Sequence, residues 1–336
     1  MIIYLEFFLA TAVILFSGYK LSVYGDVIAE KTGLSRLWLG VALMASVTSL
    51  PELATGLSAV LVARVPDIAA GGIFGSCAFN VFILGLLDIL SRKMPLSARV
   101  HQRNILSAGF TLLLMGIAGL GVAMGNTLPG LSWIGIYTPI LIFIYLASMR
   151  MIYLFEKRSG VPHASQPATD RDRKDKYAGL SLKRASALYA VNALIVIAAA
   201  IFLPGLAEKI ALLTGLGNMF VGNIFVAVAT SLPELAICIA AMKIGAVDMA
   251  VGNIFGSNLF NMMILALEDV FYFGGPLLAA AGKSQAVAIA SAMAMTGLAI
   301  SGLIYNSKKK KFITAWDSTG VIALYFANLI LLYLMR

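Results

Sequence analysis

Charged side chains are scarce in this chain. Only 12% of the 336 residues are charged, against about 25% in an ordinary soluble domain, and 60% are hydrophobic. This composition excludes a conventional water-soluble globular domain. Apolar runs of about 20 residues recur along the whole chain, and each is long enough to cross a hydrocarbon core about 30 Å thick. We therefore predict an all-α fold, that of a polytopic membrane protein.

Cysteine and histidine are almost absent, with two of each. Cys77 and Cys238 fall inside apolar runs, where a free cysteine behaves as a small apolar residue. His101 and His163 lie between such runs, and the chain has no H-E-x-x-H sequence or comparable catalytic signature. The sequence thus predicts neither an enzyme nor a bound cofactor.

The basic residues describe membrane topology. The formal charge of +9 is spread over short segments between apolar runs, which argues against a nucleic-acid partner. If the N-terminus lies outside, 21 of the 25 basic residues fall on the cytoplasmic side. We therefore expect a multi-pass protein of the cytoplasmic membrane, embedded in its lipid bilayer, with both termini outside and a cytoplasmic loop at 155–183. The four exceptions are Arg64, Lys209, Lys283 and Arg336.

The apolar runs predict ten transmembrane segments. Helices are expected because every backbone polar group must find its partner internally when it is surrounded by lipid. The predicted segments are 2–20, 37–62, 68–90, 104–124, 131–154, 184–204, 219–242, 248–270, 285–305 and 315–335.

An internal repeat divides the chain. The sequence T-S-L-P-E-L-A occurs at 48–54 and again at 230–236, and G-x-I-F-G-S-x-x-F-N follows each copy, at 71–80 and 252–261. We predict two five-helix repeats, at 1–154 and 184–336. Because five is an odd number, the second repeat enters the membrane from the opposite side. Inverted repeats of this kind are usual in secondary transporters, whose binding site lies near the membrane midplane.

Each repeat carries a carboxylate into the membrane, at Glu52 and Glu234. Such a charge costs at least about 2.5–3.5 kcal/mol at the bilayer centre, so the two glutamates predict a binding site. On a helix, hydroxyl side chains three and four residues earlier share the face of each glutamate, and a serine and an asparagine four apart share a face of the next helix. The predicted ligand set is Glu52, Glu234, Asn80, Asn261, Thr48, Thr230, Ser49, Ser231, Ser76 and Ser257.

Five further acidic residues receive structural interpretations. Asp67 and Asp248 stand at the starts of predicted segments, where a carboxylate is suited to capping a helix. Asp88, Asp269 and Glu268 stand at the far ends of these segments. There we expect anchoring at the membrane interface.

The residues alone leave the transported ion open. Oxygen ligands suit hard cations, and two carboxylates neutralise one Ca²⁺, but manganese or magnesium would find the same ligand atoms. Two embedded glutamates could also exchange a divalent ion for two protons. A cation channel is a further alternative, and the sequence does not set the oligomeric state, which could be a monomer.

The paired T-S-L-P-E and G-x-I-F-G-S-x-x-F-N motifs resemble the two alpha repeats of the cation/calcium exchanger superfamily, in particular its sodium/calcium exchanger branch. The similar regions are about 37–90 and 219–270. The resemblance implies exchange of Ca²⁺ for Na⁺ by alternating access, with the first and sixth helices as sliding gates. It also implies calcium ligation by Glu52 and Glu234, with the threonines lending oxygens, the serines lining sodium sites and the asparagines completing the centre.

One departure from that branch concerns the charge of the site. Its members often have an aspartate where this chain has Asn261. The centre then holds two carboxylates, so the resemblance leaves Na⁺ or H⁺ open as the coupling ion.

Overall fold

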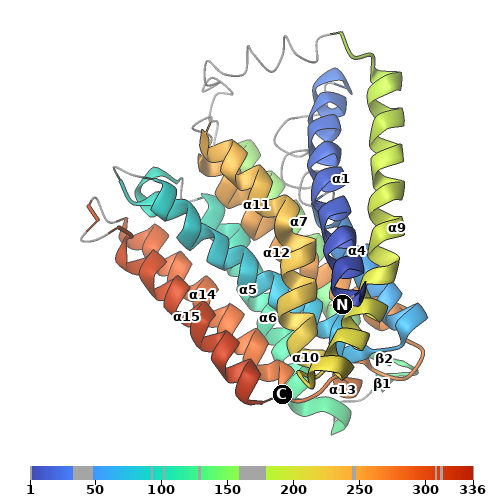
Figure 1. Cartoon of the computed structure of the whole chain (residues 1–336). Coiled ribbons are helices and arrows are strands. Elements are labelled where there is room, and N and C mark those ends of the chain that lie inside the picture. Colours follow the sequence, from blue (N-terminus) through green and yellow to red (C-terminus); the bar gives the residue numbers. More distant parts are fainter. Residues whose placement is uncertain are drawn as a thin grey trace.

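The computed structural model describes residues 2–32, 48–91, 94–100, 103–127, 130–158, 179–243, 247–306, 309–310 and 313–335 (Figure 1). The longer helices are α1 (Ile2–Thr32), α5 (Pro66–Leu90), α6 (Arg103–Met124), α7 (Tyr137–Arg158), α9 (Leu182–Thr214), α11 (Ala227–Lys243), α12 (Val247–Phe271), α14 (Gln285–Tyr305) and α15 (Trp316–Leu334). The shorter elements are α4 (Leu50–Ser58), α10 (Asn218–Val221), α13 (Leu277–Ala280), the π-helices η2 (Ala59–Ala63) and η5 (Gly222–Val226), the 3-10 helices η3 (Leu96–Arg99) and η4 (Gly125–Thr127), and the strands β1 (Gly130–Leu131) and β2 (Ile134–Gly135).

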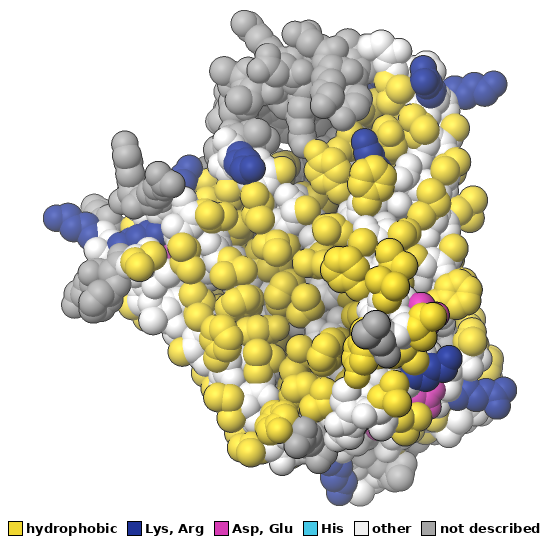
Figure 2. All heavy atoms as spheres, in the orientation of Figure 1, with side chains coloured by type: hydrophobic (Ala, Val, Ile, Leu, Met, Phe, Trp, Pro, Cys, Tyr) yellow, Lys and Arg dark blue, Asp and Glu magenta, His cyan; other side chains and the backbone are white. Residues whose placement is uncertain are grey.

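The helices confirm the polytopic membrane fold. Within the described residues, nine helical segments are long and apolar enough to cross a membrane, and Leu50–Ala63 is a shorter apolar helix. The first part of the predicted segment 37–62 lies outside the described residues. Figure 2 shows apolar side chains over the middle of the visible face, with Lys and Arg towards its ends. This distribution suits a bundle surrounded by lipid.

Three helix boundaries in the described residues differ most from the predicted ones. α1 continues to Thr32 and α9 to Thr214. Both helices extend beyond the apolar stretch that is needed to cross the hydrocarbon core. Gly215 ends α9 with a left-handed φ of 69°. α7 begins at Tyr137, later than predicted, because β1 pairs with β2 in a short antiparallel hairpin.

The most buried helices are α5 and α12. Over their most apolar stretches 83% and 78% of the residues are buried, against 17% for α1 and 28% for α9. α1 and α9 pack on each other and lie side by side in Figure 1, apart from α14 and α15. α5 and α12 thus form the centre of the fold, and α1 and α9 form a pair at its edge.

Glycines let α5 approach η5 closely. A methyl group at Gly75 would overlap the backbone carbonyl of Asn223, and one at Gly71 would lie 2.9 Å from the Asn223 side-chain nitrogen. The absence of a side chain at these positions therefore brings α5 against the segment that leads into α11.

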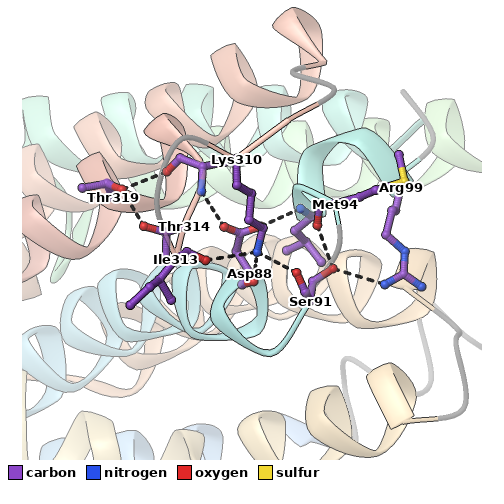
Figure 3. A network of polar contacts seen from close by, with 10 residues as sticks. Asp88, Ser91, Met94, Arg99, Lys310, Ile313, Thr314 and Thr319 are labelled. Atoms are coloured by element: carbon purple, nitrogen blue, oxygen red, sulfur yellow. Dashed lines mark hydrogen bonds and ion pairs between the residues drawn. The ribbon is translucent and has the colours of Figure 1, made fainter.

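Asp88 is a buried anchor for two loops, so its predicted interfacial role is wrong. The residue has no exposed surface, and its carboxylate accepts the backbone N–H groups of Leu96, at 2.6 Å, and Ala315, at 2.8 Å. Lys310 forms an ion pair with it at 3.3 Å and donates to the carbonyls of Asp88 and Ser91 (Figure 3). Buried loop N–H groups need acceptors, which explains the position of this carboxylate.

Asp269 plays the same part in the second repeat. It is fully buried and accepts the N–H groups of Gly135, at 2.8 Å, and Leu277, at 2.6 Å, together with the hydroxyl of Tyr137, at 2.7 Å. Leu277 follows Asp269 by eight residues, as Leu96 follows Asp88. The interfacial prediction is also wrong for Asp269, and again for Glu268, which has no exposed surface.

The capping role predicted for Asp67 is wrong as well. Val65 occupies the N-cap of α5, and the Asp67 carboxylate instead accepts the N–H of Gly282 at 2.7 Å. Asp248 lies in the first turn of α12 and accepts a hydrogen bond from Asn104 at 3.3 Å. Both aspartates thus join the start of a central helix to another segment.

Candidate cation site

The fold brings all ten residues predicted from the sequence into the buried centre. They come from the start of α4 and from α5, α11 and α12, and none is more than 3% exposed. These four segments carry the two copies of both motifs. The buried residues are Thr48, Ser49, Glu52, Ser76, Asn80, Thr230, Ser231, Glu234, Ser257 and Asn261.

The two repeats meet through crossed hydroxyl contacts. The Thr48 hydroxyl lies 3.2 Å from that of Ser257, and the Ser76 hydroxyl lies 3.4 Å from that of Thr230. Each pair joins the threonine of one repeat to the serine of the other, so exchanging the repeats converts one pair into the other. The centre therefore has the two-fold pseudo-symmetry expected of inverted repeats.

Each glutamate also faces the opposite repeat. Ser231 donates a hydrogen bond of 2.8 Å to Oε1 of Glu52, while the hydroxyls of Thr48 and Ser49 lie beside Glu234. Oε2 of Glu52 and both carboxylate oxygens of Glu234 accept no hydrogen bond from the described residues. The two carboxylates are close enough to interact electrostatically. A cation between the two carboxylates would offset their mutual repulsion, and it would give the unpaired carboxylate oxygens a binding partner.

The two asparagines present their oxygens to the site because their nitrogens are bound elsewhere. Nδ2 of Asn80 donates to Oδ1 of Asn258 at 2.9 Å, and Nδ2 of Asn261 lies 3.8 Å from Sγ of Cys77. Asn258 in turn donates to the Cys77 carbonyl at 3.0 Å. The Oδ1 atoms of Asn80 and Asn261 have no donor in the described part of the chain. An amide oxygen without a donor is a suitable ligand for a hard cation.

The chemistry of the site is set by neutral oxygens around two carboxylates. Among the described residues, no group of three or more His, Cys, Asp or Glu side chains is placed to hold a metal ion. Hydroxyl and amide groups therefore make up the rest of the cluster. Its two negative charges match one divalent cation, and the oxygen-only composition matches the ligands that calcium prefers.

Backbone carbonyls adjoin the same cluster. The Thr230 hydroxyl donates to the carbonyl of Val226 at 3.1 Å and approaches that of Ala227 at 3.3 Å. These residues lie where the π-helix η5 gives way to α11, and π-helical turns often occur at functional sites. The carbonyls thereby hold the threonine of the second motif in place.

Sequence reasoning missed the role of Asn258. Its side chain holds the Asn80 amide and the Cys77 carbonyl together, and it is fully buried. The signal was present, because Asn258 belongs to the second glycine-rich motif and differs from Cys77 at the equivalent position. The orientation of the Asn80 and Asn258 amide groups appears only when the two segments are packed together.

Comparisons with known proteins agree with this architecture. A family profile described as "Sodium/calcium exchanger protein" matches residues 2–154 and 185–334. The uncharacterized membrane protein MJ0091 of Methanocaldococcus jannaschii is 30% identical over 330 residues, covering 95% of this chain and 94% of the relative. The sodium/calcium exchanger MaX1 of Methanosarcina acetivorans is 28% identical, with 91% of each chain covered.

A solved structure of the sodium-calcium exchanger NCX_Mj, soaked with 100 mM Na⁺ and 10 mM Sr²⁺, has a similar fold. The TM-score is 0.63 at 25% identity, and the match covers 97% of both chains. The family profile spans both repeats of the chain and therefore all four helical segments that form the buried oxygen cluster. This chain belongs to the sodium/calcium exchanger family.

Proposed function

We propose that this protein is a secondary antiporter that exchanges Ca²⁺ for Na⁺ by alternating access. The observation that carries the proposal is the pair of buried glutamates, Glu52 and Glu234. Oε2 of Glu52 and both carboxylate oxygens of Glu234 have no hydrogen-bond donor among the described residues, in a cluster that otherwise offers hydroxyl and amide oxygens. The relatives named as sodium/calcium exchangers support the choice of ions. The protein is then a transporter rather than an enzyme, and the ions are its substrates.

Competition for shared oxygens would couple the two ions. Ca²⁺ takes six to eight oxygen ligands, and the two carboxylates would neutralise its charge at the centre. Na⁺ ions would use the same carboxylates together with the flanking serine hydroxyls, those of Ser49, Ser76, Ser231 and Ser257. Because one set of oxygens cannot hold both loads, binding of one ion releases the other.

We assign the gating movement to α1 and α9. These helices pack on each other at the edge of the bundle, and α1 crosses the second motif at Pro233. A methyl group at Gly18 of α1 would lie 2.7 Å from that proline. On the other side, the Ser58 hydroxyl of α4 donates to the Ile201 carbonyl of α9 at 2.7 Å. Sliding of α1 and α9 would therefore change the contacts that these two helices make with α11 at Pro233 and with α4 at Ser58.

The transport assay uses purified protein in vesicles with an imposed Na⁺ gradient. We expect Ca²⁺ uptake to depend on that gradient, and Glu52→Gln to lose both uptake and Ca²⁺ binding. Removing one member of a buried charge pair costs about 3–5 kcal/mol, so binding should weaken by roughly two to four orders of magnitude. Glu6→Gln is the matched control, because Glu6 is exposed on α1. Normal transport by Glu52→Gln would remove this glutamate from the site.

Exchange of Ca²⁺ for H⁺ is the second candidate. Proton exchange is favoured by the asparagine at 261. Because this residue is not an acid, the cluster holds only the carboxylates of Glu52 and Glu234, which together can exchange one divalent ion for two protons. Uptake at constant Na⁺ that stops when a pH gradient is collapsed would support proton coupling. Uptake that follows the Na⁺ gradient at equal pH would support the sodium exchanger.

A further inference from the structure

A third membrane-embedded glutamate lies outside the central cluster. Glu268, near the end of α12, is fully buried, and neither of its carboxylate oxygens has a hydrogen-bond partner among the described residues. Its Oε1 atom lies against Gly56 of α4, where a methyl group would overlap it. The glycine thus makes room for this carboxyl group.

The position of Gly56 connects Glu268 to the central cluster. Gly56 follows Glu52 by four residues on the same face of α4, a rise of about 6 Å along the helix. Thr55 stands three residues after Glu52, and its buried hydroxyl also lacks a partner in the described chain. The next residue after Glu268, Asp269, binds the β1–β2 hairpin. Glu268 and Thr55 therefore lie between the central cluster and the hairpin end of the bundle.

The other repeat has no such acid. Since Asp88 and Asp269 are equivalent, the counterpart of Glu268 is Leu87, and the counterpart of Gly56 is Cys238. Leu87 and Cys238 are fully buried, so apolar side chains fill these positions in one half of the protein. Packing alone therefore does not require the carboxyl. Of the two pseudo-symmetric positions, one therefore carries an acid that the other lacks.

The surroundings of Glu268 favour a proton on this carboxyl. A buried carboxylate without a partner costs several kcal/mol, whereas a carboxylic acid carries no charge. Among the described residues of the segments packed against α12, the other ionisable groups contact different partners or lie at the surface. Asp67, Asp88, Asp248 and Asp269 bind Gly282, Lys310, Asn104 and Gly135, respectively, while Tyr137 donates to Asp269 and Arg99 to Ser91. Glu52 and Glu234 belong to the central cluster, Cys77 lies by Asn261, Cys238 donates to Ala250, Tyr145 packs on Phe260, and the Tyr272 ring lies against Gly274. Arg64, Arg150, Tyr153 and Lys243 are exposed.

We propose that Glu268 is a proton-binding site on the ion path between the central cluster and the hairpin end of the bundle, and that passing cations displace its proton. The Thr55 hydroxyl supplies a second oxygen on this path. The displacement of the proton by passing cations rests on the proposed transport function. The presence of the proton on Glu268 does not. Low pH on the hairpin side would keep the proton in place and slow the passage of cations, whereas low pH on the opposite side would act only at the centre.

Infrared spectroscopy tests the proton without any transport. The carbonyl band of a protonated carboxylic acid is compared between the unaltered protein, Glu268→Gln and Glu268→Leu; the leucine variant copies the residue at the equivalent position of the first repeat. We expect both variants to lose one such band, and Leu87→Ile, a substitution at the equivalent position, to retain it. Retention of the full band by both Glu268 variants would overturn the proposal.

Transport in vesicles of known orientation tests the path. We expect uptake by the unaltered protein to slow as pH falls on the hairpin side, and uptake by Glu268→Gln to lose most of that dependence, with its Ca²⁺ dissociation constant changed less than about twofold. An unchanged pH profile in this variant would overturn the path. If the unaltered protein neither binds nor transports Ca²⁺, the proposed function fails, while the infrared result still decides whether Glu268 holds a proton.

Discussion

Asn258 offers a sharp test of how the cation site is held together. Its Oδ1 accepts the 2.9 Å hydrogen bond from Nδ2 of Asn80, and its own amide donates to the Cys77 carbonyl at 3.0 Å. Asn258→Ala removes both interactions without removing any predicted ligand. The Asn80 amide could then rotate and turn its nitrogen, a donor, towards the place of the cation.

The expected loss follows from the arrangement of these amides. A neutral hydrogen bond contributes about 0.5–1.5 kcal/mol, and loss of a group that orients a metal ligand commonly weakens metal affinity about 10- to 100-fold. We therefore expect Asn258→Ala to weaken Ca²⁺ binding by about 1.4–2.7 kcal/mol. Asn253→Ala is the matched control, since Asn253 is a buried asparagine on the same helix whose nitrogen lies 3.8 Å from the Cys238 sulfur.

Calorimetric titration with Ca²⁺ measures the effect, and a double-mutant cycle with Asn80→Ala locates it. If Asn258 acts by orienting Asn80, the double variant binds Ca²⁺ about as weakly as Asn80→Ala alone. Two results would refute the reasoning. One is unchanged affinity in Asn258→Ala, and the other is full additivity of the two substitutions.

Three further predictions concern packing, a loop anchor and orientation. Gly75→Ala should lower stability by about 1–3 kcal/mol because its methyl group meets the Asn223 backbone. Gly109→Ala should leave stability unchanged, because open space surrounds Gly109. Equal thermal unfolding temperatures of the two variants in detergent would contradict this prediction. Lys310→Met should cost about 1–3 kcal/mol by the same assay, since Asp88 loses its ion pair, and no loss would refute the anchor. Ser132→Cys, in the exposed hairpin, should react with a membrane-impermeant maleimide from outside the cell; labelling only from the cytoplasmic side would reverse the proposed topology.

Much of the fold could be predicted because lipid restricts the choices available to a chain. Apolar runs in a bilayer must be helices, and this rule predicts the polytopic helical fold. The two five-helix repeats stay a prediction from the duplicated motifs. Helix ends were less predictable, as α1 and α9 show, because a helix continues past the membrane for as long as its backbone hydrogen bonds are kept. Asp88 and Asp269 were misread because their partners come from loops distant in the sequence or across a turn.

The sequence by itself determined which chemical groups enter the membrane. Glu52 and Glu234 are identifiable from the chain alone, since an unpaired carboxylate in an apolar run is too costly to be incidental. Only the tertiary structure decided how those groups face one another. Three contacts join the two repeats. Thr48 lies against Ser257, Asn258 orients the Asn80 amide, and Glu268 lies against Gly56. Such contacts depend on packing between distant segments, which motif spacing within one helix does not specify.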